Sequence, residues 1–154
     1  MLDTWPSPAA AQDEGKENIK FVKADFTKMA EAARLGRELE AAEVVALTHG
    51  ILPHSTREET PDGLEKDMAV SCLSRLVLLR ELLPRLAAGS RVFVWGMPGN
   101  GTAFAHPDDL NAEKSYEGGF GWVHMNTVGG NEAIVHVLAP RFKDKGVSVR
   151  SEEH

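Results

Sequence analysis

His124 and Tyr116 are two side chains of this sequence that have the chemistry of proton transfer. His124 carries an imidazole, and its reference pKa of about 6.5 suits proton exchange near neutral pH. Tyr116 is the only tyrosine. Its phenol, with a reference pKa of about 10, is a poor base at neutral pH without help from a neighbouring group. These two residues are the catalytic candidates, and a His124 that only packs on its helix or faces solvent is the competing interpretation.

A glycine-rich segment imitates a phosphate-binding loop. Gly96, Gly99 and Gly101 follow an apolar run. A phosphate-binding loop holds its anion through the amino-terminal amides of a helix that begins directly after it. Residues 102–107 do not favour the start of a helix, so the sequence predicts a flexible loop here.

No metal site is predicted. His49, His54 and His106 have no metal-ligand spacing with any acidic residue. Cys72, the only cysteine, lies on the apolar stripe of a predicted helix, which indicates packing rather than nucleophilic chemistry.

The composition is that of one globular domain: 154 residues, of which 42% are hydrophobic and 26% charged. The net charge of -6 argues against a broad nucleic-acid surface, which needs clustered Lys and Arg. No apolar run approaches the roughly 20 residues of a membrane helix, and no secretory signal is recognised at the start. With one cysteine, a reducing cytoplasm is the expected compartment.

Strands and helices alternate along the chain and must position these groups. Residues 1–17 predict a loose tail, which leaves one domain over residues 18–154. An alternating pattern predicts a strand over residues 19–25, and apolar runs predict strands over residues 43–50, 91–96 and 146–151. Helices are predicted between them over residues 27–40, 60–84 and 122–141. This order is typical of an α/β fold with a parallel sheet and right-handed crossovers.

Capping residues and one apolar stripe carry the helix predictions. Thr27 is the expected cap of the first helix, and Thr60-Pro61-Asp62 combines a capping hydroxyl, a proline and an acid at the start of the second. The second helix is predicted to be amphipathic, because apolar residues recur at steps of three or four, at Leu64, Met68, Cys72, Leu76, Leu79 and Leu83.

Four stretches of this sequence, at Ala24-Asp25-Phe26-Thr27 and at residues 44–52, 67–86 and 91–96, resemble the short-chain dehydrogenase/reductases, particularly the divergent types abundant in fungi. Ala24-Asp25-Phe26-Thr27 is similar to the end of the family's third strand, and residues 44–52 to its fourth strand. Residues 67–86 resemble the following helix with its Leu-Pro-x-Leu phrase, and residues 91–96 the fifth strand. The resemblance covers residues 19–151 and implies a truncated Rossmann-like three-layer sandwich with a mostly parallel sheet.

The resemblance also implies a cofactor and a reaction. In the family, the position of Asp25 lies near the adenine of NAD(P), and Thr48 and Gly50 fall in the Asn-Ala-Gly motif, of which only the glycine is present. These three residues are the cofactor-binding candidates. The implied reaction is NAD(P)-dependent oxidation or reduction of a small alcohol or carbonyl compound, with secondary metabolism as one setting.

The family's catalytic motifs are replaced in this chain. The Gly-rich turn precedes the matched region, and the catalytic Asn and Ser positions fall on Ser71 and on Gly96 or Met97. The Tyr-x-x-x-Lys pair falls on His124 and Val128, and taking Tyr116 instead leaves Phe120 at the lysine position. Weak or no independent catalysis is therefore expected. A divergent site around Thr48, Tyr116 and His124 is the first alternative, and a non-enzymatic binding or scaffold protein is the second.

The resemblance also predicts an incomplete sheet. In the family, the first and second strands separate the third from the fourth, so a strand over residues 19–25 loses its usual neighbour here. It must pair with residues 43–50, pair with another chain, or stay poorly ordered. Unpaired strand edges favour association, so a homo-oligomer is predicted.

Overall fold

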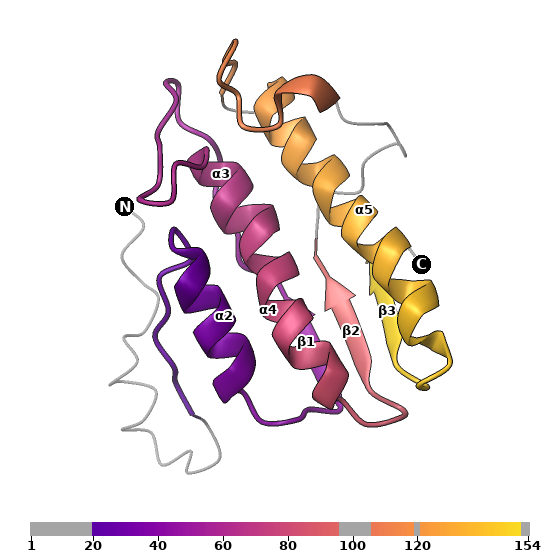
Figure 1. The fold of residues 1–154 in the computed structure, drawn as a ribbon. Coiled ribbons are helices and arrows are strands. Elements are labelled where there is room, and N and C mark those ends of the chain that lie inside the picture. Colours follow the sequence, from indigo (N-terminus) through magenta and orange to yellow (C-terminus); the bar gives the residue numbers. More distant parts are fainter. Residues whose placement is uncertain (1–19, 96–105, 119–120, 152–154) are drawn as a thin grey trace, which may run out of the picture.

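A computed structural model describes residues 20–95, 106–118 and 121–151 of the chain. Its centre is a three-stranded parallel sheet in the order β1-β2-β3 (Figure 1). The strands are β1 (Val44–Leu47), β2 (Arg91–Val94) and β3 (Ser148–Ser151), in a register that aligns their first residues. The three corresponding strand predictions are confirmed, with shorter bounds.

Helices connect the strands of the described chain. The longer ones are α2 (Met29–Glu38), α4 (Ser74–Leu82) and α5 (Trp122–Lys143). A short helix α3 (Lys66–Met68) and a π-helical turn η1 (Ala69–Leu73) lead directly into α4, and a 3-10 turn η2 (Leu83–Arg85) ends it. A further 3-10 turn, η3 (Pro107–Asp109), precedes α5. In the described residues no helix is both long and apolar enough to span a bilayer.

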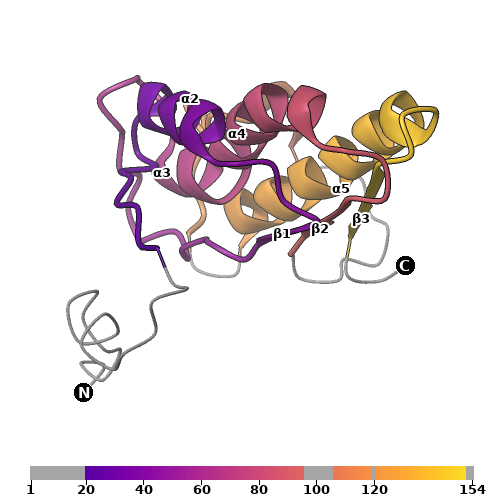
Figure 2. The same ribbon diagram turned by 90° about the horizontal axis from the view of Figure 1, so that it is seen from below.

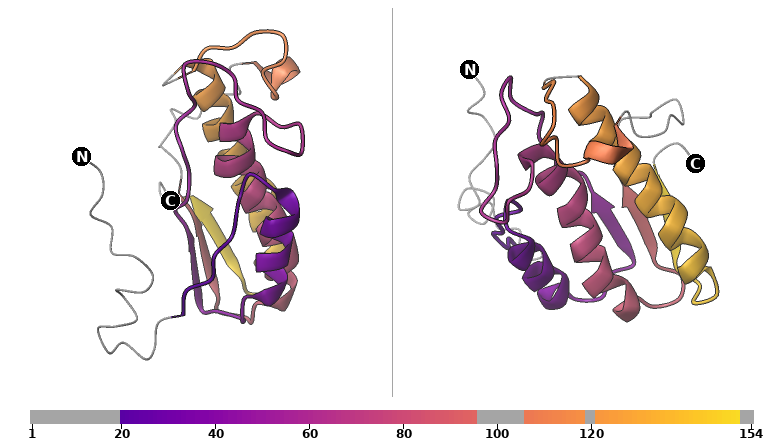
Figure 3. Two further views of the ribbon diagram at one scale, coloured as in Figure 1. Left: turned by 90° about the vertical axis from the view of Figure 1, so that its left-hand side faces the viewer. Right: turned by 45° about the horizontal axis from the view of Figure 1, so that its top comes forward.

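The helices form one layer against one face of the sheet (Figures 2 and 3). The core between the two layers joins Val92, Val94 and Val149 of the strands to Leu79 and Leu83 of the helical segment, all at least 96% buried. The α/β class and the Rossmann-like parallel sheet are thereby confirmed. Of the three layers expected, the described residues supply two.

The strand predicted over residues 19–25 is wrong for its described part, because residues 20–25 are not in a strand. Within the described chain, β1 pairs only with β2, so its other edge has no ladder. A segment without a hydrogen-bonded neighbour cannot be a strand of a sheet. Lys23 instead offers its carbonyl to the Arg34 guanidinium of α2 at 2.9 Å. Ile19 and the loose tail predicted over residues 1–17 lie outside the described residues.

Two residues of the predicted helix starts, Thr27 and Asp62, have other roles. The Thr27 hydroxyl donates to the Asp25 carboxylate at 2.6 Å rather than capping α2. The first amide of α2, at Met29, donates to the Asp62 carboxylate at 2.7 Å. The second helix begins at Lys66 instead of residue 60, with Glu65 as its side-chain cap. Asp62 therefore stabilises the start of a helix 33 residues before it in sequence.

The predicted apolar stripe of the second helix is confirmed except at Leu64 and Leu76. Met68, Cys72, Leu79 and Leu83 are buried, whereas Leu64 is half-buried and Leu76 is 37% exposed. Leu78 and Leu82 are buried in addition. The π-helical turn η1 precedes Leu76 and widens the hydrogen-bond spacing of this part of the helical segment. A periodicity read at constant α-helical spacing does not include this turn.

Candidate functional site

The carboxyl ends of β1 and β2 form the edge where open parallel sheets bind their ligands. Thr48, His49 and Gly50 follow β1 directly, and Trp95 follows β2. Thr48 and Gly50 are exposed at this edge, as a binding role requires, whereas His49 is half-buried. A Cβ on Gly50 would lie 3.2 Å from the Ser71 hydroxyl, so the missing side chain lets this loop pack closely on the helical segment.

Arg75, on α4, ties the two strand ends together. Its side chain is buried, with 3% of the residue exposed. The guanidinium donates to the carbonyl oxygens of His49 and Trp95, and to the Asn131 side-chain oxygen on α5 at 3.2 Å. Asn131 in turn donates to the Ser71 and Thr127 carbonyls, each at 3.0 Å. One side chain thus fixes β1, β2 and α5 relative to one another.

His49 is held as a neutral imidazole. Its ring stacks on Phe26, with centroids 4.3 Å apart, and its Nε2 lies 3.1 Å from the Ser74 hydroxyl. The Ser74 hydroxyl donates its one hydrogen to the Val70 carbonyl at 2.7 Å, so it must accept from His49 Nε2–H. Burial, and then the positive charge of Arg75, lower the pKa of His49 to about 4.

This lowered pKa predicts a loss of stability in mild acid. The unfolded chain takes up a proton on His49 near the ordinary pKa of 6.5, while the folded protein takes it up only near 4. The contribution is therefore complete above pH 6.5 and is lost as the pH falls toward 4. With allowance for partial solvent exposure, the loss should be about 2 kcal/mol. Urea unfolding of wild type and His49→Phe at pH 7 and pH 5 should show a steeper loss for the wild type. The exposed-site variant His136→Gln should follow the wild type.

Asp67 is the centre of a second buried cluster, at the junction of α3 and α5. This carboxylate is fully buried. Its Oδ1 accepts from the Ser71 hydroxyl at 2.6 Å, and its Oδ2 accepts from the Thr127 hydroxyl at 3.0 Å. His124 Nδ1 lies 3.0 Å from the same Oδ2, and the His124 side chain is 13% exposed. The structure thus brings Ser71 and His124, two of the catalytic motif positions, onto one carboxylate.

Tyr116 is engaged elsewhere. Its hydroxyl donates to the His54 carbonyl at 3.0 Å. Burial first, and then the negative charges of Glu65 and Asp67, raise the pKa of Tyr116 above its ordinary value. Both effects oppose ionisation of the phenol, so proton loss from Tyr116 is harder than from a free tyrosine.

The Asp25 carboxylate forms contacts within its own turn, with Thr27 and Lys28. Its carboxylate accepts from the Thr27 amide at 3.1 Å and the Thr27 hydroxyl at 2.6 Å, and it pairs with Lys28 at 3.2 Å. The Thr27 hydrogen bond, followed by the Lys28 contact, lowers the pKa of Asp25 below its ordinary value. The neighbouring Phe26 stacks on His49, and this contact places the turn beside the end of β1.

The described residues do not by themselves fit a dinucleotide. They contain no glycine-rich turn that leads from a strand into a helix, which is the arrangement that holds a pyrophosphate. Gly50 packs on Ser71, and the Asp25 carboxylate is bonded within its own turn. The glycine-rich segment with Gly96, Gly99 and Gly101, the Met97 position and Phe120 lie outside the described residues.

Metal and thiol chemistry have no support in the described part of the chain. It holds no group of three His, Cys, Asp or Glu residues that could bind a metal ion. Cys72 is buried, and burial raises the pKa of its thiol to about 12. The sulfur therefore stays protonated at neutral pH, which agrees with a packing role.

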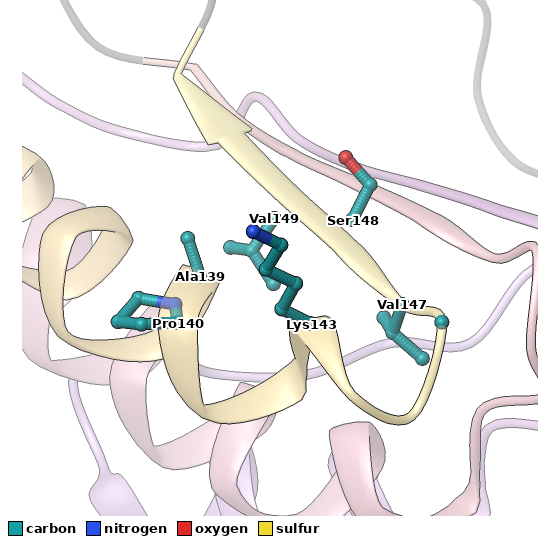
Figure 4. Close-up of a pocket in the computed structure, with 7 residues that line it drawn as sticks. Ala139, Pro140, Lys143, Val147, Ser148 and Val149 are labelled. Carbon is teal, nitrogen blue, oxygen red and sulfur yellow. The ribbon is translucent and has the colours of Figure 1, made fainter.

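A hollow of about 430 Å³ lies between the end of α5 and the start of β3 (Figure 4). Ala139, Pro140 and Lys143 line one side, and Val147 to Val149 the other. It lies at the amino end of β3, opposite the edge that carries His49 and Trp95. The hollow is therefore separate from the candidate site.

No family model matches this sequence. An uncharacterised oxidoreductase of Saccharomyces cerevisiae is 39% identical over 138 residues, which cover 82% of this chain and 44% of the yeast protein. A short-chain dehydrogenase family protein from Francisella tularensis has a similar fold, with a TM-score of 0.60, 18% identity, and coverage of 88% of this chain and 51% of that one. BdcA in complex with NADPH has a TM-score of 0.61 and 14% identity, over 93% of this chain and 54% of that one. BdcA comes from E. coli.

The described residues have the α/β fold of the short-chain dehydrogenases among these solved structures, and the sequence is similar to a curated oxidoreductase. These similarities agree with the resemblance to the short-chain dehydrogenase/reductases that the sequence motifs indicated. It spans less than half the length of the curated relative that it matches.

Three residues of the site were not anticipated from sequence: Asp67, Arg75 and the neutral His49. One signal was present, because Asp67, Ser71 and Arg75 are polar residues at steps of four within an otherwise apolar helix. Polar residues on a buried helical face must be hydrogen-bonded. Their spacing alone points to a buried polar network.

Proposed function

We propose that this chain forms part of an NAD(P)-dependent oxidoreductase for small alcohols or carbonyl compounds, with weak or no turnover by itself. The likeness to short-chain dehydrogenases and to the NADPH-bound BdcA fold supports the cofactor and the reaction class. The cytoplasm is the proposed compartment for a chain with one cysteine.

One observation carries the proposal of weak turnover. At the family's Asn, Tyr and Lys positions the described chain has Ser71, His124 and Val128, and Val128 is an apolar residue, 5% exposed. A buried valine cannot supply the positive charge that lowers the pKa of a catalytic phenol. The groups that remain bind and orient, but they lack the family's means of activating a base.

Cofactor titration tests this proposal. The purified chain is titrated with NADPH and with NADH, and nicotinamide fluorescence is followed together with thermal unfolding. A ligand that binds the native state must raise apparent stability by mass action. We expect weak binding, with stabilisation at millimolar cofactor and none in the micromolar range. Complete absence of stabilisation at millimolar concentrations, in a cooperatively unfolding sample, contradicts the cofactor part of the proposal.

A working enzyme with a divergent site is the second candidate. The hydrogen bond between His124 Nδ1 and Asp67 favours it, because an imidazole oriented by a carboxylate is a common arrangement for proton transfer. Oxidation of NADPH with a broad panel of aldehydes and ketones, compared between wild type and His124→Phe, separates the two candidates. Turnover that depends on His124 supports the divergent enzyme, and the absence of NADPH oxidation with every compound of the panel rejects it.

Association with a second copy, or with a scaffold partner, stays a proposal. Parallel sheets are ordinarily covered on both faces, whereas the described helices cover one (Figures 2 and 3). Val44 is 49% exposed and Trp95 is 56% exposed at the strands. We expect a concentration-dependent dimer in sedimentation-velocity ultracentrifugation, weakened by Val44→Lys. A compact monomer at all concentrations contradicts self-association.

A further inference from the structure

A continuous path of hydrogen bonds runs from the end of β1 to the first turn of α5. The Ile51 amide donates to the Ser71 hydroxyl at 2.9 Å. That hydroxyl donates to Asp67 Oδ1 at 2.6 Å, and Asp67 Oδ2 lies 3.0 Å from His124 Nδ1. The path therefore connects the ligand-binding edge of the sheet to the one imidazole at a catalytic motif position.

We propose that Asp67 is a positioning residue that holds His124 with its hydrogen on Nδ1, so that Nε2 is the atom that exchanges a proton with a ligand oxygen at this edge. Its use in catalysis rests on the second candidate under the proposed function, a working enzyme with a divergent site. The positioning itself rests only on the side chains of this cluster.

The direction of each hydrogen bond supports this assignment. The Ser71 and Thr127 hydroxyls both donate to Asp67, which therefore acts as an acceptor. An acceptor at 3.0 Å from His124 Nδ1 requires the hydrogen to be on Nδ1. The neutral ring then carries its lone pair on Nε2, where it accepts from a hydroxyl, and the protonated ring donates from Nε2 to a carbonyl oxygen.

Asp67 and His124 differ in burial, and therefore in the role that each can have. Asp67 is fully buried and has its oxygens occupied by three donors, so it cannot meet a ligand itself. His124 is at the first turn of α5 and is 13% exposed. Asp67 consequently acts through the imidazole, as carboxylates behind catalytic or metal-binding histidines do. Tyr116 donates its hydroxyl hydrogen to the His54 carbonyl, so this hydroxyl is not oriented by a carboxylate as His124 is.

Heteronuclear NMR of the histidine ring nitrogens tests the proposal on the native protein. At a pH where the ring is neutral, we expect His124 to carry its hydrogen on Nδ1, with the chemical shift of an unprotonated nitrogen at Nε2. A native His124 with its hydrogen on Nε2 overturns the proposal, and this measurement requires no variant to fold.

Asp67→Asn and Thr127→Val provide the matched comparison. In Asp67→Asn, the amide that replaces the carboxylate can donate to Nδ1, so we expect the hydrogen of His124 to move to Nε2. Thr127→Val removes another donor from the same carboxylate and should leave the His124 hydrogen on Nδ1. An unchanged tautomer in a folded Asp67→Asn protein contradicts the positioning role.

The cofactor titration distinguishes failure of this inference from failure of the proposed function. A chain that binds NADPH but has its His124 hydrogen on Nε2 rejects the role of Asp67 alone. A chain with the hydrogen on Nδ1 that does not bind NADPH or NADH rejects the proposed function and leaves Asp67 as the positioning residue.

Discussion

Replacing Arg75 with leucine should lower the free energy of unfolding by about 3–5 kcal/mol. The guanidinium donates to two backbone carbonyls at the ends of β1 and β2, and to Asn131. Leucine fills part of the volume but leaves these acceptors without their donors, and each unsatisfied buried polar group costs about 1–3 kcal/mol. The expected loss is a large fraction of the roughly 5–15 kcal/mol by which a domain is ordinarily stable.

Urea unfolding followed by circular dichroism measures this loss. Arg75→Lys keeps the charge but lacks the planar fork that reaches several acceptors, so it should have intermediate stability. Arg80→Leu is the matched control on the same helix, because the Arg80 side chain is 73% exposed and, among the described residues, pairs with Glu81 at 3.3 Å. We expect that control to change stability by less than about 0.5 kcal/mol. An Arg75→Leu protein as stable as Arg80→Leu would show that the strand ends do not depend on the guanidinium.

Asp67→Ala should lower the free energy of unfolding by about 2–4 kcal/mol. The change removes the common acceptor of Ser71, Thr127 and His124, and it leaves a small cavity between α3 and α5. Removal of a buried charge offsets part of this cost, because an ionised carboxylate is expensive to desolvate. The net effect remains destabilising, since three donors lose their partner in a fully buried position.

Thr127→Val is the control for this second variant. It removes one of the three donors and keeps the shape of the side chain, so a loss of about 1 kcal/mol is expected. Equal losses for Asp67→Ala and Thr127→Val would mean that the carboxylate organises no network. Because Asp67→Ala acts on stability, it complements Asp67→Asn, which reports on the tautomer of His124.

The alternation of strands and helices was predictable from sequence because apolar runs and periodicities are local signals. The runs around Val44 and Val92 predicted the strands, and α5 forms through Gly129 and Gly130 despite their low helix propensity. The strand prediction for the segment before α2 was wrong for a reason that is not local to its sequence. Its alternating pattern suits a strand, but a strand also needs a neighbour, and the sequence of the segment does not contain that information.

The candidate site was predictable in part. His124 was identified by its chemistry and its motif position, and it lies on the Asp67 network. Tyr116 was identified by the same reasoning, but its hydroxyl is bonded to the His54 carbonyl. Thr48 and Gly50 lie at the expected sheet edge, while Asp25 is bonded within its own turn. These differences depend on contacts between residues up to 62 positions apart, which local patterns do not specify.

The π-helical turn at Ala69–Leu73 sets the angular phase between two parts of one helical segment. Asp67 before the turn faces His124, and Arg75 after it faces the strand ends. If the same residues were wound as a continuous α-helix, Arg75 and Leu79 would rotate by about 100° relative to Asp67. That rotation would turn Arg75 away from the strand ends while leaving every candidate catalytic side chain in the sequence. For this segment, the winding of the backbone is as much a functional property as the identity of its residues.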